Sequence, residues 1–228
     1  MTKPLIIFGS SEVAALANFY FTHDSEFDVI AFTVDDEFVK STSFEGLPVI
    51  PFSEINNNYP ASKYNMHVAL SYMQLNQSRE KKYYQAKSAG YTLVNYISSK
   101  ASFWPDLEVG DNCFILEDQT IQPSVKIGNN VMLWSGNHIG HGTKIGDHTY
   151  LASHVVVSGN CTIGKRCFFG VNSTFKDFLE IGDDVFVAMD ASVTKNLASN
   201  SVVLGAKCKV FNPDDVVGQK IKKLYFKL

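Results

Sequence analysis

Apolar residues recur at every sixth position along the second half of the chain. The series runs without a break from Val109 to Val193. A glycine directly follows every third apolar residue of this series, as in Val109-Gly110 and Ile127-Gly128. A period of eighteen residues is therefore superimposed on the period of six. The fifteen apolar positions are Val109, Ile115, Ile121, Ile127, Leu133, Ile139, Ile145, Leu151, Val157, Ile163, Phe169, Phe175, Ile181, Val187 and Val193.

A period of six fits neither an α-helix nor a β-hairpin, whose side chains repeat every ~3.6 and ~2 residues. It is typical of a short strand plus a tight turn, three of which form one triangular coil that stacks on its neighbours at about 4.8 Å. The fifth hexad position is usually small or β-branched, as an inward-facing corner requires, and it includes Cys113, Cys161 and Cys167. We therefore predict a parallel β-helix with free, buried thiols.

The first hundred residues follow a different pattern, in which short apolar runs alternate with helical segments. We expect strands at residues 5–8, 29–34, 47–50, 68–70 and 91–95, and helices at 13–21 and 76–89. The turn Gly9-Ser10-Ser11-Glu12 separates the first strand from the first helix. This alternation predicts an α/β domain with a Rossmann-like parallel sheet.

The chain after Val210 predicts a C-terminal helix. Asn212 suits the N-cap and Pro213 the first helical position, while Lys220, Lys222 and Lys223 lie toward the other end, where they complement the helix dipole. We expect its apolar face to pack on the β-helix. The predicted boundaries are 1–100 for the α/β domain, 101–211 for the β-helix and 212–228 for the C-terminal helix.

Composition narrows the class of protein. The net charge of -3 and the pI of about 6.1 argue against a nucleic-acid partner. No apolar run approaches the ~20 residues that cross a bilayer, and Leu5-Ile6-Ile7-Phe8 meets a turn at once, which predicts a strand and not a signal peptide. The four cysteines form no CxxC pair. We expect a cytoplasmic protein with no membrane or nucleic-acid partner.

The hexad pattern resembles the hexapeptide-repeat acyltransferases, whose parallel β-helix is left-handed. That hand is what the resemblance implies, because the general rule for parallel crossovers is right-handed.

Four of the six histidines fall within one coil's length of sequence: His138, His141, His148 and His154. They flank the core positions Ile139 and Leu151, so they project outward or lie at corners. We expect His148 to be an ordinary surface residue. His154 is expected at a corner, where it is either inert or contacts the acceptor or a neighbouring subunit.

Zinc binding and base catalysis are the two chemistries open to these histidines. A zinc site of the γ-carbonic-anhydrase type needs a third histidine two coils earlier, where Ser102 and Pro105 stand, so we predict no metal. A neutral imidazole can instead take the proton that an amine or hydroxyl loses on attacking a thioester. Gly159 follows His141 by eighteen residues and would lie on the next coil, where its N–H could stabilise the oxyanion and its missing side chain would admit the thioester.

The whole chain resembles the two-domain sugar acyltransferases of the NeuD/PglD type. The motifs that carry this resemblance are, in order, Gly9-Ser10-Ser11, Val34-Asp35-Asp36, the hexads, Ile139-Gly140-His141, Ser158-Gly159-Asn160 and Leu204-Gly205-Ala206-Lys207. The resemblance implies that the α/β domain holds a nucleotide-linked sugar through Gly9, Ser10, Ser11, Asp35 and Asp36. It further implies that acetyl-CoA lies between two subunits of a homotrimer, near Ser158, Gly159, Gly205, Ala206 and Lys207, and that the general base is His141.

Three features depart from that family's usual pattern. The first turn has one glycine where the family has two or three, and the C-terminal motif lacks a proline. The residue after the base is Gly142 where the family often has an acid, so we expect His138 or Asn137 to orient the imidazole or share the proton. Asp35 and Asp36 are either a solvated turn or acceptors for a ribose or base.

These observations predict an acyl-CoA-dependent, most simply acetyl-CoA-dependent, N-acyltransferase that acts on the amino group of a nucleotide-linked sugar in bacterial surface-glycan synthesis. Two alternatives stay open. One is a sugar O-acetyltransferase of the sialic-acid type, which needs the same base, and the other is a non-catalytic β-helix scaffold.

Overall fold

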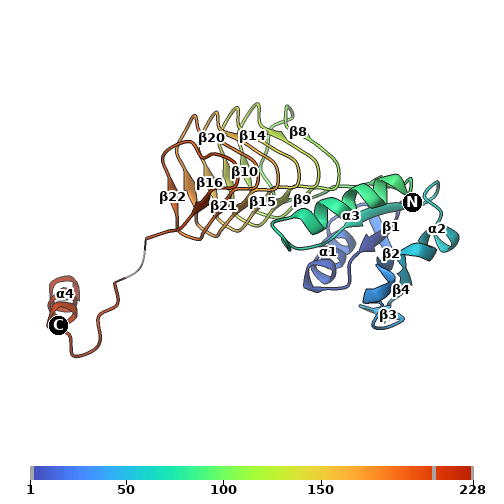
Figure 1. Ribbon diagram of the computed structural model, residues 1–228, viewed down its shortest axis with the longest axis horizontal. Helices are drawn as coiled ribbons and strands as arrows, with labels where there is room; N and C mark the ends of the chain where they lie inside the picture. Colours follow the sequence, from blue (N-terminus) through green and yellow to red (C-terminus); the bar gives the residue numbers. More distant parts are fainter. Residues whose placement is uncertain (1–2, 207–208, 227–228) are drawn as a thin grey trace.

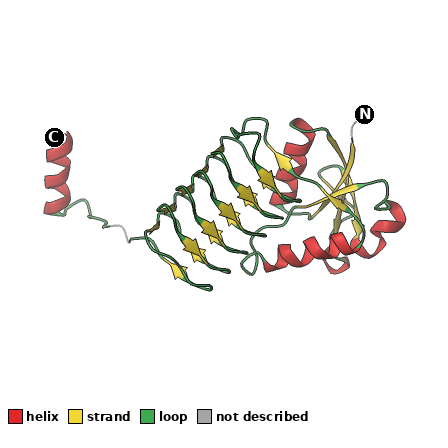
Figure 2. Ribbon diagram, turned by 90° about the horizontal axis from the view of Figure 1, so that it is seen from above, coloured by secondary structure: helices red, strands yellow, loops and turns green. Residues whose placement is uncertain are grey.

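The computed structural model describes residues 3–206 and 209–226. An α/β domain lies at one end of a β-helix, and a helix lies beyond the other end (Figures 1 and 2).

The α/β domain is built on a six-stranded sheet in the order β3-β4-β2-β1-β5-β6. All neighbouring strands in it are parallel except β3 and β4. Its strands are β1 (Lys3–Phe8), β2 (Phe27–Val34), β3 (Ser43–Phe44), β4 (Leu47–Pro51), β5 (Asn65–Val68) and β6 (Thr92–Leu93). Its helices are α1 (Glu12–His23), α2 (Ile55–Asn58) and α3 (Gln77–Ser88), with short 3-10 turns at Asp36–Phe38 and Phe52–Glu54. The expected elements are present, although the strand expected at 68–70 lies earlier, at Asn65–Val68.

The β-helix has three flat faces, which we name after their outward side chains. The aromatic face holds β7 (Tyr96–Ile97), β9 (Phe114–Ile115), β12 (Met132–Leu133), β15 (Tyr150–Leu151), β18 (Phe168–Phe169), β21 (Phe186–Val187) and β23 (Val202–Val203). The histidine face holds β10 (Thr120–Ile121), β13 (His138–Ile139), β16 (Val156–Val157), β19 (Thr174–Phe175) and β22 (Ser192–Val193). The charged face holds β8 (Glu108–Val109), β11 (Lys126–Ile127), β14 (Lys144–Ile145), β17 (Thr162–Ile163) and β20 (Glu180–Ile181).

The period of eighteen is the register of the stacked coils. Ile127 pairs with Ile145 and Leu133 with Leu151, so residues eighteen apart lie side by side. Of the fifteen hexad residues, all but the half-buried Val109 are buried in one core, and Cys113, Cys161 and Cys167 are buried, free thiols within it. The predicted parallel β-helix and its buried cysteines are confirmed.

The α/β domain packs against the aromatic face. Phe21 of α1 shares one apolar cluster with Phe114, Met132 and Tyr150. On the other side of the domain, the fully buried Arg79 of α3 donates hydrogen bonds to the carbonyls of Asn130 and His148. These contacts hold α3 against the β-helix.

The C-terminal helix differs from the prediction in two ways. Helix α4 (Val216–Phe226) begins after Asp215, whose side chain accepts a hydrogen bond from the Val217 N–H at 2.8 Å, so Asp215 and not Asn212 is the cap. The expected packing on the β-helix is wrong, because Val217, Ile221 and Leu224 are 51, 41 and 78% exposed and α4 stands apart from the coils (Figure 1). Within the described residues, no helix combines the length and apolarity needed to span a membrane.

Candidate functional site

His141 lies at an exposed corner between the histidine face and the charged face. This corner, which we call the His141 corner, also contains Ser158-Gly159-Asn160 of the next coil. Gln122 Oε1 accepts a hydrogen bond from the His141 backbone N–H at 2.9 Å and lies 3.1 Å from Nδ1. An amide oxygen only accepts, so Nδ1 donates its proton to Gln122 and Nε2 is the ring nitrogen that accepts. Asn160 Nδ2, 3.3 Å from Nε2, donates toward it, which agrees with this tautomer.

Gln122 is a site residue that the sequence analysis missed. It holds the imidazole where we had expected His138 or Asn137 to do so. Asn137 instead donates to the carbonyl of Trp134 at 2.5 Å and accepts from the Val155 N–H. Because Gln122 stacks beside Gly140, eighteen residues later, the coil register could have identified it.

Gly159 lies directly beneath the His141 ring. A Cβ at this position would be 2.6 Å from Cε1 and 2.9 Å from Nε2 of His141. The Gly159 N–H has no acceptor within the described residues, whereas the equivalent N–H one coil earlier, that of His141, is bound by Gln122. The corner therefore places a basic ring nitrogen beside a free backbone donor.

The other residues predicted for acyl-CoA and acceptor are spread over two corners and one face of the β-helix. The Ser158 carbonyl accepts a hydrogen bond from Thr143 Oγ1 at 3.1 Å. His138 is half-buried on the histidine face, and His154 is exposed at the corner between the aromatic and histidine faces. Gly205 and Ala206 follow β23, where Gly205 packs so closely that a Cβ would be 2.8 Å from the Met189 carbonyl oxygen. Lys207 lies outside the described residues.

The structure brings the predicted nucleotide-side residues together in one cleft of about 1510 Å³. The cleft lies at the carboxyl ends of β1 and β2 and runs along α3 as far as Arg166 and Asp184 of the β-helix. Gly9, Ser10, Ser11, Asp35 and Asp36 all line it. Gly9 has φ +134°, and a Cβ there would be 2.7 Å from the Ala69 carbonyl oxygen, so only glycine fits this turn.

The two aspartates of the cleft are held by neighbours. Lys82 Nζ is 2.6 Å from Asp35 Oδ1. The Ser53 hydroxyl and N–H donate to the Asp36 carboxylate, and these hydrogen bonds lower the Asp36 pKa. Neighbouring groups therefore hold both carboxyl groups on the wall of the cleft, and the hydrogen bonds from Ser53 favour the ionised form of Asp36.

His148 is buried, which contradicts the expectation of an ordinary surface residue. Its ring is 1% exposed because α3 covers it, with Tyr83 and Tyr84 edge-on against it. Asn130 Nδ2 donates to Nδ1 at 2.9 Å, and Nε2 is 3.4 Å from Glu80 Oε1. Burial lowers the His148 pKa to about 4, so the ring is neutral.

His141 and the cleft do not meet within one chain. The cleft reaches the β-helix at Arg166 and Asp184, which belong to the corner between the charged and aromatic faces. The two corners are separated by one side of the coil, about six residues or roughly 20 Å of extended chain. Among the described residues, no cluster of three or more histidine, cysteine or acidic side chains is arranged to hold a metal ion.

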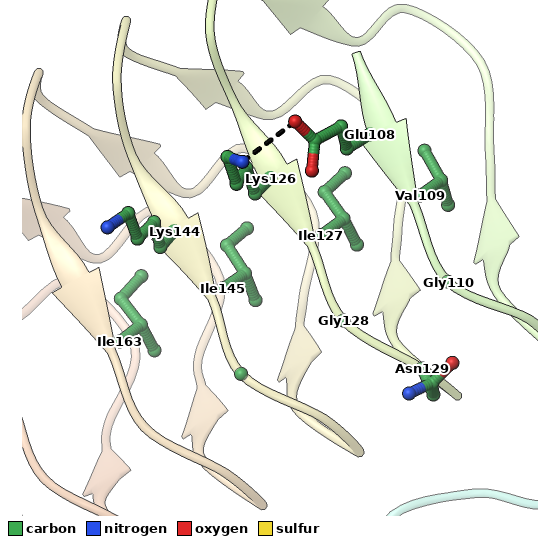
Figure 3. A pocket seen from close by; sticks show the side chains of 11 residues that line it. Glu108, Val109, Gly110, Lys126, Ile127, Gly128, Asn129, Lys144, Ile145 and Ile163 are labelled. Carbon is green, nitrogen blue, oxygen red and sulfur yellow. Dashed lines mark ion pairs between the residues drawn. The ribbon is translucent and has the colours of Figure 1, made fainter.

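A second, shallow hollow of about 410 Å³ lies on the charged face (Figure 3). Its floor is formed by Ile127 and Ile145, and Lys126 pairs with Glu108 at 2.7 Å beside it. None of the predicted site residues lines it.

Comparison with known proteins identifies the repeats in the sequence. Residues 124–159 match the family described as bacterial transferase hexapeptide (six repeats), and residues 161–195 match the hexapeptide repeat of succinyl-transferase. The chain is 36% identical over 97 residues to UDP-3-O-acylglucosamine N-acyltransferase from Bordetella pertussis, covering 41% of this chain and 25% of that protein. It is 32% identical over 136 residues to the bifunctional protein GlmU from Streptococcus uberis, covering 52% and 30%. The chain thus matches less than a third of the length of each relative.

Solved structures match nearly the whole fold. PerB from Caulobacter crescentus, in complex with CoA and GDP-perosamine, has a TM-score of 0.80 at 21% identity, covering 93% of this chain and 99% of that one. The acetyltransferase domain of PglB from Neisseria gonorrhoeae, in complex with acetyl coenzyme A, has a TM-score of 0.80 at 16% identity, covering 92% and 100%. The predicted fold is confirmed: an α/β domain, then a left-handed parallel β-helix, then a helix.

Proposed function

We propose that this hexapeptide-repeat protein is a CoA-dependent N-acyltransferase, with acetyl-CoA as donor and a nucleotide-linked amino sugar as acceptor. The observation that carries the proposal is the His141 corner. There, the ring nitrogen Nε2 of an exposed histidine lies beside a backbone N–H that has no acceptor among the described residues.

The chemistry of this corner suits acyl transfer. The acceptor nitrogen attacks the thioester carbonyl carbon, and its proton passes to His141 Nε2 as the new N–C bond forms. The Gly159 N–H donates to the carbonyl oxygen, which becomes negative. When the carbonyl re-forms, the C–S bond breaks, and the departing CoA thiolate takes the proton from the imidazolium. Gln122 keeps the Nδ1–H group of His141 oriented throughout. We retain His138, the other histidine predicted to be catalytic, as part of the proposed site.

We further propose that the site is shared between copies of the chain in a homotrimer. The cleft and His141 of one chain lie at different corners, so a sugar in the cleft would reach His141 of a neighbouring copy. Acetyl-CoA would lie along the β-helix near Ser158, Gly205, Ala206 and Lys207, and His154 would face the acceptor. The nucleotide would lie on Gly9, Ser10, Ser11, Asp35 and Asp36.

The solved structures support this assignment by analogy. PerB binds CoA and GDP-perosamine, and PglB binds acetyl coenzyme A, in the same fold. A histidine-to-alanine mutant of the perosamine N-acetyltransferase, with a TM-score of 0.68 and 19% identity, also holds CoA and GDP-perosamine. Because acetyl-CoA and nucleotide-linked sugars are cytoplasmic pools, we place the enzyme in the cytoplasm, in bacterial surface-glycan synthesis.

The test is a CoA-release assay with acetyl-CoA and matched amino and hydroxyl sugars linked to UDP, GDP and dTDP. We expect turnover on an amino sugar and a fall of kcat/KM by at least about 100-fold in His141→Ala, with the oligomer unchanged. Turnover confined to hydroxyl acceptors, sialic acid included, would indicate the O-acetyltransferase alternative. An absence of turnover, with no rise in melting temperature on adding acetyl-CoA, would indicate the scaffold.

A further inference from the structure

Three charged side chains form a network at the end of the cleft nearest the β-helix. Arg166 Nε and Nη2 donate to the two carboxylate oxygens of Asp184 at 2.7 and 2.8 Å, and Nη1 donates to Glu80 at 3.2 Å. All three residues line the cleft, with side chains only 18 to 22% exposed. We call this set the carboxylate network.

The network retains acceptors that face the cleft. The Arg166 guanidinium is occupied by both acids, while each carboxylate has lone pairs beyond those that bind Arg166. The Arg166 hydrogen bonds lower the Asp184 pKa, so Asp184 stays ionised. His148, behind Glu80, is neutral. Within the network itself, two carboxyl groups face one guanidinium, so acidic groups are in excess by one.

The position of the network defines which part of a nucleotide-sugar would meet it. In a sheet of this type the diphosphate lies at the first strand–helix turn, here Gly9 to Ser11, and the nucleoside lies toward the acid at the end of the second strand, here Asp35. The remaining arm of the cleft runs along the start of α3 to Glu80, Arg166 and Asp184. That arm is left for the sugar.

We propose that the carboxylate network is the sugar subsite and selects sugars that are cationic or neutral over sugars that bear a carboxylate. This inference rests on the proposed function. Glu80 and Asp184 accept hydrogen bonds from ring hydroxyls, and their net charge favours binding of an amino sugar as the ammonium ion, which releases one proton to solvent before its nitrogen attacks the thioester. The same charge repels an acidic sugar of the sialic-acid or uronic-acid class.

Binding calorimetry tests the subsite without using activity. UDP, GDP and dTDP are titrated first, and the one that binds is compared with its 4-amino-4,6-dideoxyhexose and its hexuronate derivatives. In Glu80→Gln and in Asp184→Asn we expect the amino-sugar derivative to bind roughly tenfold to a hundredfold more weakly, because the acceptor loses its charge and a charge-assisted hydrogen bond becomes a neutral one. The affinity for the bare diphosphate should stay within about twofold. The preference for the amino sugar over the hexuronate should fall at least about tenfold in the double variant.

Glu108→Gln is the matched control. Glu108 also pairs with a cation on the β-helix, at 2.7 Å from Lys126, but it lies on the charged face and outside the cleft (Figure 3). The Glu108→Gln substitution should change neither the affinity for the bare diphosphate nor the affinity for the amino-sugar derivative. Equal weakening of the diphosphate and the sugar derivative in the Glu80 and Asp184 variants would show a structural role and overturn the proposal. Unchanged sugar affinity, or failure of all three diphosphates to bind, would also overturn it. Sugar binding without any acyl transfer would leave the subsite standing while contradicting the proposed function.

Discussion

Replacing Gly159 by alanine should displace the proposed base without disturbing the fold. The new Cβ would be 2.6 Å from His141 Cε1, 2.9 Å from Nε2 and 3.0 Å from Nδ1, whereas ordinary contacts begin at 3.4 Å. The ring must therefore move by about 0.8 Å or more, which weakens the Nδ1 hydrogen bond to Gln122. Gly159 does not have the left-handed φ that would strain an alanine, so the backbone should accept the change.

The expected magnitude follows from that displacement. A misplacement of about 1 Å in a reacting group can cost about 100-fold, so kcat/KM for Gly159→Ala should fall roughly 30-fold to 100-fold, or about 2 to 3 kcal/mol of transition-state stabilisation. The melting temperature should change by only about 2 °C. The assay is CoA release with varied acetyl-CoA and varied acceptor, alongside thermal unfolding.

A double-mutant cycle with His141→Ala isolates the cause. If the methyl group acts by moving the imidazole, Gly159→Ala has little further effect once the imidazole is gone. Fully additive losses would refute this reasoning, and so would a Gly159→Ala enzyme with more than half of wild-type kcat/KM. A loss confined to the KM for acetyl-CoA would show that the glycine admits the donor and does not position the ring.

The remaining predictions concern orientation, pH, the first turn and the C-terminal helix. Gln122→Ala should lower kcat about tenfold with little change in either KM, because Nδ1–H loses its acceptor; steady-state kinetics measures this, and an unchanged kcat contradicts it. His67 and His148 are buried with pKa values lowered to about 4, so the unfolded chain, with histidine pKa values near 6.5, binds more protons below that pH. Stability should therefore be complete above about pH 6.5 and fall toward pH 4 by up to about 3 kcal/mol per histidine, and a flat melting profile over that range would exclude this linkage. Gly9→Ala should destabilise the α/β domain by about 1 to 3 kcal/mol, measured by denaturant unfolding, since its Cβ meets a backbone oxygen at 2.7 Å. Deletion of residues 212–228 should leave the melting temperature of the β-helix unchanged, because the described apolar side chains of α4, from Val216 to Tyr225, are exposed, and a loss of more than about 5 °C would show an unrecognised contact.

The sequence predicted the structure correctly where the determining interactions are between residues close in the chain or repeat at a fixed period. A strand of two residues turns one side chain inward and one outward, so burial of Ile127, Ile145 and Ile163 imposed the period of six and the coil register on the sequence itself. The same register places Gly159 beneath His141 and could have identified Gln122. Gly9, Asp35 and Asp36 follow their strands directly, and parallel strands bring their carboxyl ends to one edge of the sheet.

Other features were decided only by the tertiary structure, because they depend on how the α/β domain packs against the β-helix. His148 occupies a corner position that a lone β-helix would expose, and only the approach of α3, held by Arg79, buries it. Glu80 and Arg166 are 86 residues apart and meet for the same reason. The sequence showed that α4 is amphipathic, but not what its apolar face contacts. Hydrophobic burial determines which face of a helix or strand turns inward, but the hydrophobic effect has no preferred direction. The pairing of polar groups across an interface therefore follows only from the relative orientation of the two domains.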